Sequence, residues 1–278
     1  MVLAALPMFV IVVLVGVLIS ISFQSGILGT SDAEFTFQNY RDLFTDPIIA
    51  EALYNTIIFS ITATIVSMGI GLPIAWLTER TTIRAKSAVY AIMTLGLLIP
   101  GIYTAMGWTF LAHARIGFLN RWATQFFSLS EAPIDIATPI GMGFVQGLSL
   151  AALAFILTAQ MFRAMNPSLE EAAKIHGLGF FGTMRRITLP LAVPAILAAV
   201  IYIVVIGIAT FDVPAIIGLA NRVYMISTYV FEKANPGDEE FSQHGITAAL
   251  GVLMIAVALL LTWWYSTVLR QGDKYQVV

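Results

Sequence analysis

Residues 168–190 read SLEEAAKIHGLGFFGTMRRITLP, a polar and basic interval between two strongly apolar segments. Ser168 followed by Glu171 fits a capping box, in which each side chain satisfies a free backbone N–H of the first helical turn. Gly177 fits the left-handed position that ends a helix. The stretch predicts a helix of about two to three turns, too short to be stable alone in water. It must be braced by its own chain or by a partner.

The second half of this interval predicts another short helix. It is expected from Phe180 to Arg186, and Leu189–Pro190 should stop it, because a proline cannot donate the next helical hydrogen bond. Two small helices joined at a glycine, with apolar runs on both sides, indicate a hairpin between two longer elements.

Those longer elements are apolar stretches of membrane-spanning length. A helix needs roughly 20 residues to cross the hydrocarbon core, and lipid offers no partners to the backbone, so uninterrupted runs of this length indicate helices. Six stretches qualify. They are Leu3–Phe23, Leu53–Leu77, Ala88–Leu111, Pro139–Met161, Leu191–Ile217 and Gly245–Val268.

Composition supports this interpretation. Hydrophobic residues make up 59% of the chain and charged residues 11%, and the mean hydropathy is +0.88. A soluble domain of 278 residues would expose far more charge, so most of the chain must have lipid as its solvent. The absence of cysteine excludes disulfides and thiolate sites, and no basic stripe with interleaved aromatics supports nucleic-acid binding. The sequence therefore predicts an all-α, polytopic membrane protein with six spans.

The basic residues predict the orientation. Nine of the 14 Lys and Arg residues fall in the loops on one side of the six spans, and the interval 168–190 is on that side. By the positive-inside rule this side is cytoplasmic and both termini lie there. The outer segment Phe35–Glu51 mixes aromatic and charged residues, so we expect one or two short helices at the interface. This segment either meets a delivering protein or serves as an anchor.

Within the interval, the residues also carry a family resemblance. Glu171-Ala172-Ala173, then Gly177, then Ile187-x-Leu189-Pro190 resembles the EAA loop of ABC-importer permeases. The resemblance implies that the loop, residues 163–190, docks in a cleft of a separate ATP-hydrolysing subunit. The alternative is an ordinary amphipathic connector between two membrane helices.

The same resemblance implies roles and partners. Glu170, Glu171 and Lys174 would supply polar docking contacts, and Ala172 and Ala173 a small surface that fits the cleft. Expected partners are a pair of ABC ATPase subunits, a substrate-binding protein, a second permease half and the bacterial inner-membrane bilayer. ATP and Mg²⁺ would be bound by the ATPase, and this chain would bind no cofactor.

Two stretches are candidates for the translocation path. The run I-P-G-I-Y-T-A-M-G-W resembles permeases of ferric-iron and polyamine importers, and a helix broken at Pro100 would free backbone carbonyls beside Gly101 and Tyr103. A kink that serves only packing is the alternative. Asp212 is the ionisable residue expected inside an apolar span, at a cost of about 2.5–3.5 kcal/mol if it lies mid-membrane. Its surroundings, F-D-V-P with Pro214 last, are similar to the same permeases, and Asp212 is predicted to line the path or gate unless the span ends before it.

As a whole, residues 1–278 are expected to form a single permease domain that resembles the N-terminal half of longer two-half permeases. No G-x-x-x-x-G-K-[ST] or H-E-x-x-H motif occurs, so no ATP-binding loop of that kind, metal site or catalytic group is expected. By resemblance ferric iron is the first expectation for the substrate, followed by polyamine, thiamine or a phosphonate. An ion-gradient-driven secondary transporter and a membrane-embedded enzyme are the alternatives of other classes, although the former should show paired acids and an internal repeat.

Overall fold

The computed structural model describes residues 2–25, 34–235 and 244–272. Within these ranges every regular element is a helix, as predicted. The long helices are α1 (Val2–Ser22), α3 (Pro47–Arg80), α7 (Pro139–Ala164), α10 (Leu189–Ala209) and α12 (His244–Gly272). The shorter ones are α2 (Gln38–Thr45), α4 (Lys86–Leu98), α5 (Gly101–Ala112), α6 (Phe118–Phe127), α8 (Ser168–Ile175), α9 (Phe180–Thr183), α11 (Ile226–Ala234), the π-helices η1 (Met184–Thr188) and η2 (Pro214–Gly218), and the 3₁₀-helix η3 (Leu219–Asn221).

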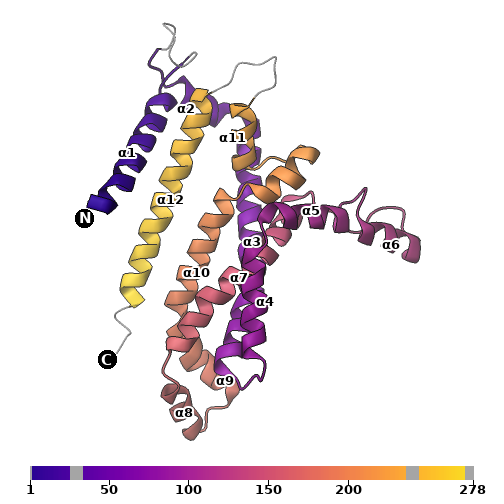
Figure 1. The fold of residues 1–278 in the computed structure, drawn as a ribbon, viewed down its shortest axis with the longest axis vertical. Helices are drawn as coiled ribbons and strands as arrows, with labels where there is room; N and C mark the ends of the chain where they lie inside the picture. The colour runs from indigo at the N-terminus through magenta and orange to yellow at the C-terminus, as the bar shows by residue number, and fades with distance from the viewer. Residues whose placement is uncertain (1, 26–33, 236–243, 273–278) are drawn as a thin grey trace.

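The predicted number of six spans is reached in the described residues only if one bent pair of helices is counted as a single, broken span. Five helices in the described residues are long and apolar enough to cross a membrane. The third predicted span, Ala88–Leu111, is instead the pair α4 and α5, bent by 94°. The expected break at Pro100 is therefore confirmed, and it turns α5 sideways, so that α5 and α6 project from the bundle as an arm (Figure 1).

The centre of the bundle is the pair α3 and α7, which pack along much of their length. Small residues make the approach possible. A Cβ on Gly147 would lie 2.6 Å from the Val66 Cβ, and one on Gly71 would lie 2.6 Å from the Ala154 Cβ. Any larger side chain at these two positions would force the helices apart.

The fifth span differs from the predicted Leu191–Ile217. Helix continues without a stop from Phe180 to Ala209, because the wide turn η1 precedes Pro190 and leaves it in the first turn of α10. The predicted stop at Leu189–Pro190 is wrong for this reason. At the other end Pro214 cannot donate to the Thr210 carbonyl, and the Ser227 hydroxyl donates to it instead at 2.8 Å. The break is at Thr210 and Phe211, and Asp212 begins the helical turn that leads into η2, so it does not lie inside a continuous span.

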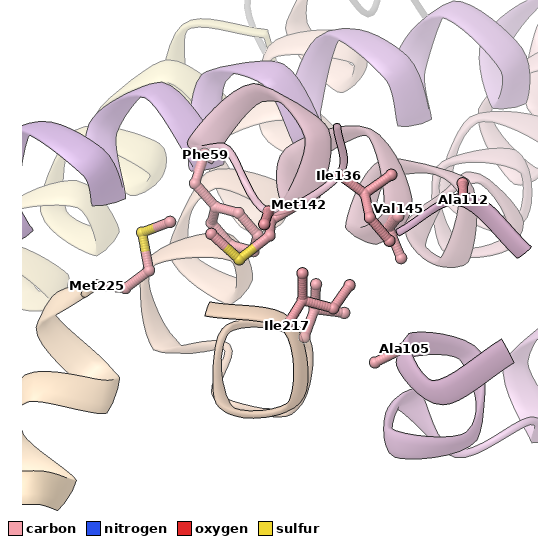
Figure 2. Close-up of a cluster of buried hydrophobic side chains, with 10 residues drawn as sticks. Phe59, Ala105, Ala112, Ile136, Met142, Val145, Ile217 and Met225 are labelled. Atoms are coloured by element: carbon pink, nitrogen blue, oxygen red, sulfur yellow. The ribbon is translucent and has the colours of Figure 1, made fainter. Parts of the chain in front are cut away.

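The two ends of the bundle differ in structure. α8 and α9 lie at one end, and α2 and α11 lie at the other (Figure 1). The predicted interfacial segment Phe35–Glu51 contains the short helix α2 and the first turn of α3. Near the base of the α5 arm, a buried cluster joins α3, α5, α7 and η2 (Figure 2). Its members include Phe59, Ala105, Met142, Val145 and Ile217.

Candidate functional site

α8 begins one residue away from the predicted capping box. Pro167 is its N-cap residue, and its carbonyl accepts hydrogen bonds from the backbone N–H groups of Glu170 and Glu171 at 3.1 Å. The Ser168 side chain does not cap the helix, so the capping-box prediction is wrong. Asn166 provides the side-chain bond instead, with its Oδ1 accepting from the Ser168 backbone N–H at 3.0 Å. Pro167 is already helical, and this moves the start of the helix upstream of Ser168.

The C-terminal end of α8 is closed by Gly177, as predicted. Gly177 has φ +80°, a backbone conformation that is energetically unfavourable for residues with a Cβ. Its N–H donates to the Lys174 carbonyl, and the Leu178 N–H donates to the Ala173 carbonyl, each at 3.0 Å. These two bonds form a Schellman motif, which satisfies carbonyls that the helix end would leave unpaired. The short helix is thus held in shape at both ends.

Six of the eight residues of α8 are exposed. The last four of these form what we call the docking face: Glu171, Ala172, Lys174 and Ile175. Ala173, by contrast, is 4% exposed and packs inward. Ile175 is 84% exposed, which is unusual for a large apolar side chain in a polar loop.

A second exposed apolar residue lies beyond Gly177. Phe181 is also 84% exposed, and it lines an open hollow with Leu178, Gly182, Arg185 and Arg186. Neither Ile175 nor Phe181 was among the docking residues predicted from the sequence. The sequence does contain a signal for them, because each is a large apolar residue in a polar interval, one before Gly177 and one after it.

Three predicted docking residues lie behind this surface, on η1 and α10. Ile187 is half-buried, whereas Leu189 and Pro190 are exposed. All three lie on the continuous helical run that leads into α10, so they connect the loop to a long helix. The remaining predicted residue, Glu170, is turned inward. Its Oε1 accepts from the Thr188 hydroxyl at 2.7 Å and lies 3.3 Å from Nη2 of Arg80.

The second candidate region is the break between α4 and α5. Pro100 is the N-cap residue of α5, and its carbonyl accepts from the Tyr103 N–H at 3.0 Å. A Cβ on Gly101 would lie 2.5 Å from Oδ2 of Asp212, so the structure brings together two features far apart in sequence.

The surroundings of Asp212 are favourable for a negative charge. Its carboxylate has no hydrogen bond or ion pair to any described residue, and it lies against the first turn of α5, where unpaired N–H groups concentrate positive potential. Pro214 is buried two residues further on, whereas Tyr103 is 65% exposed. Within the described residues no group of three or more His, Cys, Asp or Glu side chains could hold a metal ion.

Comparison with known proteins identifies the family. Residues 71–271 match the family model for the binding-protein-dependent transport system inner membrane component. The chain belongs to this family. The match runs from the last part of α3 to α12 and therefore includes both candidate regions.

Relatives of this permease are themselves permease subunits. It is 27% identical over 266 residues to the sulfoquinovosyl glycerol transport system permease protein SmoG of Agrobacterium fabrum, covering 91% of this chain and 82% of SmoG. It is 25% identical over 276 residues to the spermidine/putrescine transport system permease protein PotB of Escherichia coli, covering 92% of this chain and 96% of PotB. Neither name mentions iron.

The permease also shares its fold with a solved transporter. A chain of the bacterial alginate ABC transporter, solved in complex with an alginate pentasaccharide-bound periplasmic protein, superposes with a TM-score of 0.70 at 19% identity. The superposition covers 87% of this chain and 85% of that one. The permease is therefore a multi-pass membrane protein with the fold of ABC-importer permeases.

Proposed function

We propose that this permease forms the translocation path of an ATP-driven importer and is driven by a separate ABC ATPase that docks on α8. The observation that carries the proposal is α8 itself. It is a short helix, capped at both ends, that projects from one end of the bundle and exposes Ile175 beside charged residues. An exposed apolar side chain on a preformed helix suits insertion into a partner's cleft.

The proposed arrangement assigns each end of the bundle a partner. The α8 end faces the cytoplasm with both termini, in agreement with the distribution of Lys and Arg. The opposite end, with α2 and α11, receives a substrate-binding protein, and a second permease half completes the path. ATP and Mg²⁺ are bound and used by the ATPase, and this chain has no catalytic role of its own.

The break at Pro100 and the facing Asp212 are the proposed gate of the path. A kink this sharp leaves backbone groups that need water or protein around them. The substrate is proposed to be a small polar solute. Iron was the first expectation from the sequence. The names of the two relatives given above refer instead to sulfoquinovosyl glycerol and to spermidine/putrescine.

Co-purification tests the proposal. The permease, extracted from its native membrane in mild detergent, should bring down a protein with ATPase activity, and Glu171→Lys should release it while leaving membrane insertion intact. Glu131→Lys is the matched control, because Glu131 is an exposed glutamate in the loop between α6 and α7. Purification without an ATPase, or equal retention by both variants, would overturn the docking assignment.

One observation favours a different candidate function. A lone carboxylate at a broken helix is also a feature of ion-gradient-driven transporters. That candidate predicts uptake that stops when the gradient is collapsed and continues when ATP is removed. The proposed importer behaves in the opposite way.

A further inference from the structure

The last two residues of α3 bind different neighbours. Glu79 and Arg80 are adjacent in sequence, yet Glu79 contacts α4 and α7, whereas Arg80 contacts the loop that leads into α8 and α8 itself. In the sequence, Arg80 is one of the nine basic residues on the side predicted to be cytoplasmic. Its surroundings indicate a more specific role.

Arg80 is a buried cation with few partners. Its side chain is 8% exposed, its Nη1 donates to the Met165 carbonyl at 3.3 Å, and its Nη2 lies 3.3 Å from Oε1 of Glu170. Among the described residues, Nε and Nη2 have no hydrogen-bond partner. A buried guanidinium with so few bonds depends on its one carboxylate, because removal of Glu170 would leave its charge uncompensated.

Glu170 in turn joins three segments. The same Oε1 accepts from the hydroxyl of Thr188, which is 2% exposed and ends η1. One carboxylate oxygen therefore connects α8 to the end of α3 and to the turn that starts α10. α8 makes few other contacts with the bundle, and its docking face points away from it.

Glu79 attaches the same end of α3 to α4 and α7. Its Oε1 accepts from the Tyr90 hydroxyl at 2.7 Å and from Nη2 of Arg163 at 3.2 Å, and the Arg163 guanidinium lies 5.3 Å from the centre of the Tyr90 ring. α3, α4 and α7 are thus held together directly behind the contact between α3 and α8.

We infer that Arg80 and Glu170 are positioning residues that transmit movement of α8 to α3. This inference rests on the proposed docking of an ATPase on α8. The ATPase would contact the docking face, and the buried pair would deliver the displacement to the helix at the centre of the bundle. Glu170, predicted from sequence to contact the ATPase, contacts the permease's own helices instead.

A labelling experiment separates transmission from docking. The chain has no cysteine, so Glu51→Cys places a single thiol at the exposed far end of α3. In the permease–ATPase complex, trapping with Mg-ATP and vanadate should change the rate at which a maleimide reacts with this thiol. Arg80→Gln should reduce that change about tenfold while the ATPase still co-purifies in normal amount. Arg80→Glu with Glu170→Arg should restore the change.

Two further variants keep the test decisive if Arg80→Gln does not fold. Glu170→Gln retains an oxygen for Thr188 and loses only the ionic contact, so it should reduce the response. Arg84→Glu, an exposed arginine just beyond α3, should leave the response unchanged. A wild-type response in Glu170→Gln, or in Arg80→Gln where that variant folds, would overturn the inference. Failure of the unsubstituted protein to bring down an ATPase would instead overturn the proposed function, and the inference with it.

Discussion

Gly101 and Asp212, 111 positions apart in the chain, touch in the folded permease, and a Cβ at Gly101 would lie 2.5 Å from Oδ2 of the carboxylate. The contact places a negative side chain against the N-terminal turn of a helix that has been turned through 94°. The break in one span and the break after α10 therefore form a single structural unit.

Gly101→Ala should disturb this unit through steric overlap. The new methyl group cannot remain 2.5 Å from an oxygen, so α5 or Asp212 must move, at a cost of about 1–3 kcal/mol. We expect a lower midpoint in thermal unfolding of the detergent-purified protein. Asp212→Ala in the same chain should recover most of the loss, because it removes the oxygen that clashes. Additive losses in the double variant would show that the two residues act independently.

Gly177→Ala should damage the end of α8 without affecting the bundle. A residue with a Cβ at φ +80° costs about 1–2 kcal/mol, which is enough to loosen a helix of eight residues. We expect weaker retention of the co-purifying ATPase and unchanged thermal stability of the membrane-spanning part. Gly177→Asn is the matched control, because asparagine tolerates the left-handed conformation. Equal behaviour of the two variants would contradict the argument from backbone conformation.

Asn120→Ala should release the arm formed by α5 and α6. The buried Asn120 amide donates to the carbonyls of Ala112, His113 and Ile134 at 2.8–3.1 Å, and its Oδ1 accepts from the Ile134 N–H at 3.0 Å. Truncation leaves several buried groups unpaired, each worth about 1–3 kcal/mol. We expect faster proteolysis in the loop after α6, measured by limited digestion and mass spectrometry. Thr124→Ala, which removes a hydroxyl bonded only within its own helix, should have little effect.

High pH should weaken the junction between α11 and the start of α3. Burial, together with the hydrogen bond from the Tyr229 hydroxyl to Asp46 at 2.7 Å, raises the pKa of Tyr229. The folded protein then holds this proton more tightly than the unfolded chain, whose tyrosines titrate near about 10, so stability present below that pH is lost as the pH rises above it. Tyr229→Phe should remove this part of the pH dependence, measured as the unfolding midpoint from pH 8 to 11. An identical pH profile in both proteins would contradict it.

The sequence predicted features that depend on local backbone chemistry. Gly177 ends α8 and Pro100 breaks a span, as the left-handed preference of glycine and the missing N–H of proline predict. The same reasoning was wrong at Pro190, which lies inside a continuous helical run. Apolar length predicted the spans, because lipid imposes the same requirement on any helix.

Features that depend on tertiary contacts were not predictable in this way. Glu170 and Glu171 are identical and adjacent, and Glu170 is distinguished by its tertiary contacts with Arg80 and Thr188. The end of α10 was misplaced because Ile216 and Ile217 continue the apolar pattern, whereas a hydroxyl from Ser227 is what accommodates the break. The start of α8 was misplaced because Pro167 is already helical, so that its carbonyl, and not the Ser168 side chain, accepts from the Glu171 N–H.

The paired attachment of Glu79 and Arg80 has a geometric consequence. Consecutive side chains leave a helix about 100° apart around its axis. Both residues can keep their bonds only while α3 holds one rotational setting, and twisting the helix would break one contact or the other. The end of α3 can therefore tilt or slide together with its neighbours, but it cannot rotate about its own axis without breaking a contact. A force applied at this end would then tilt α3 as a rigid body.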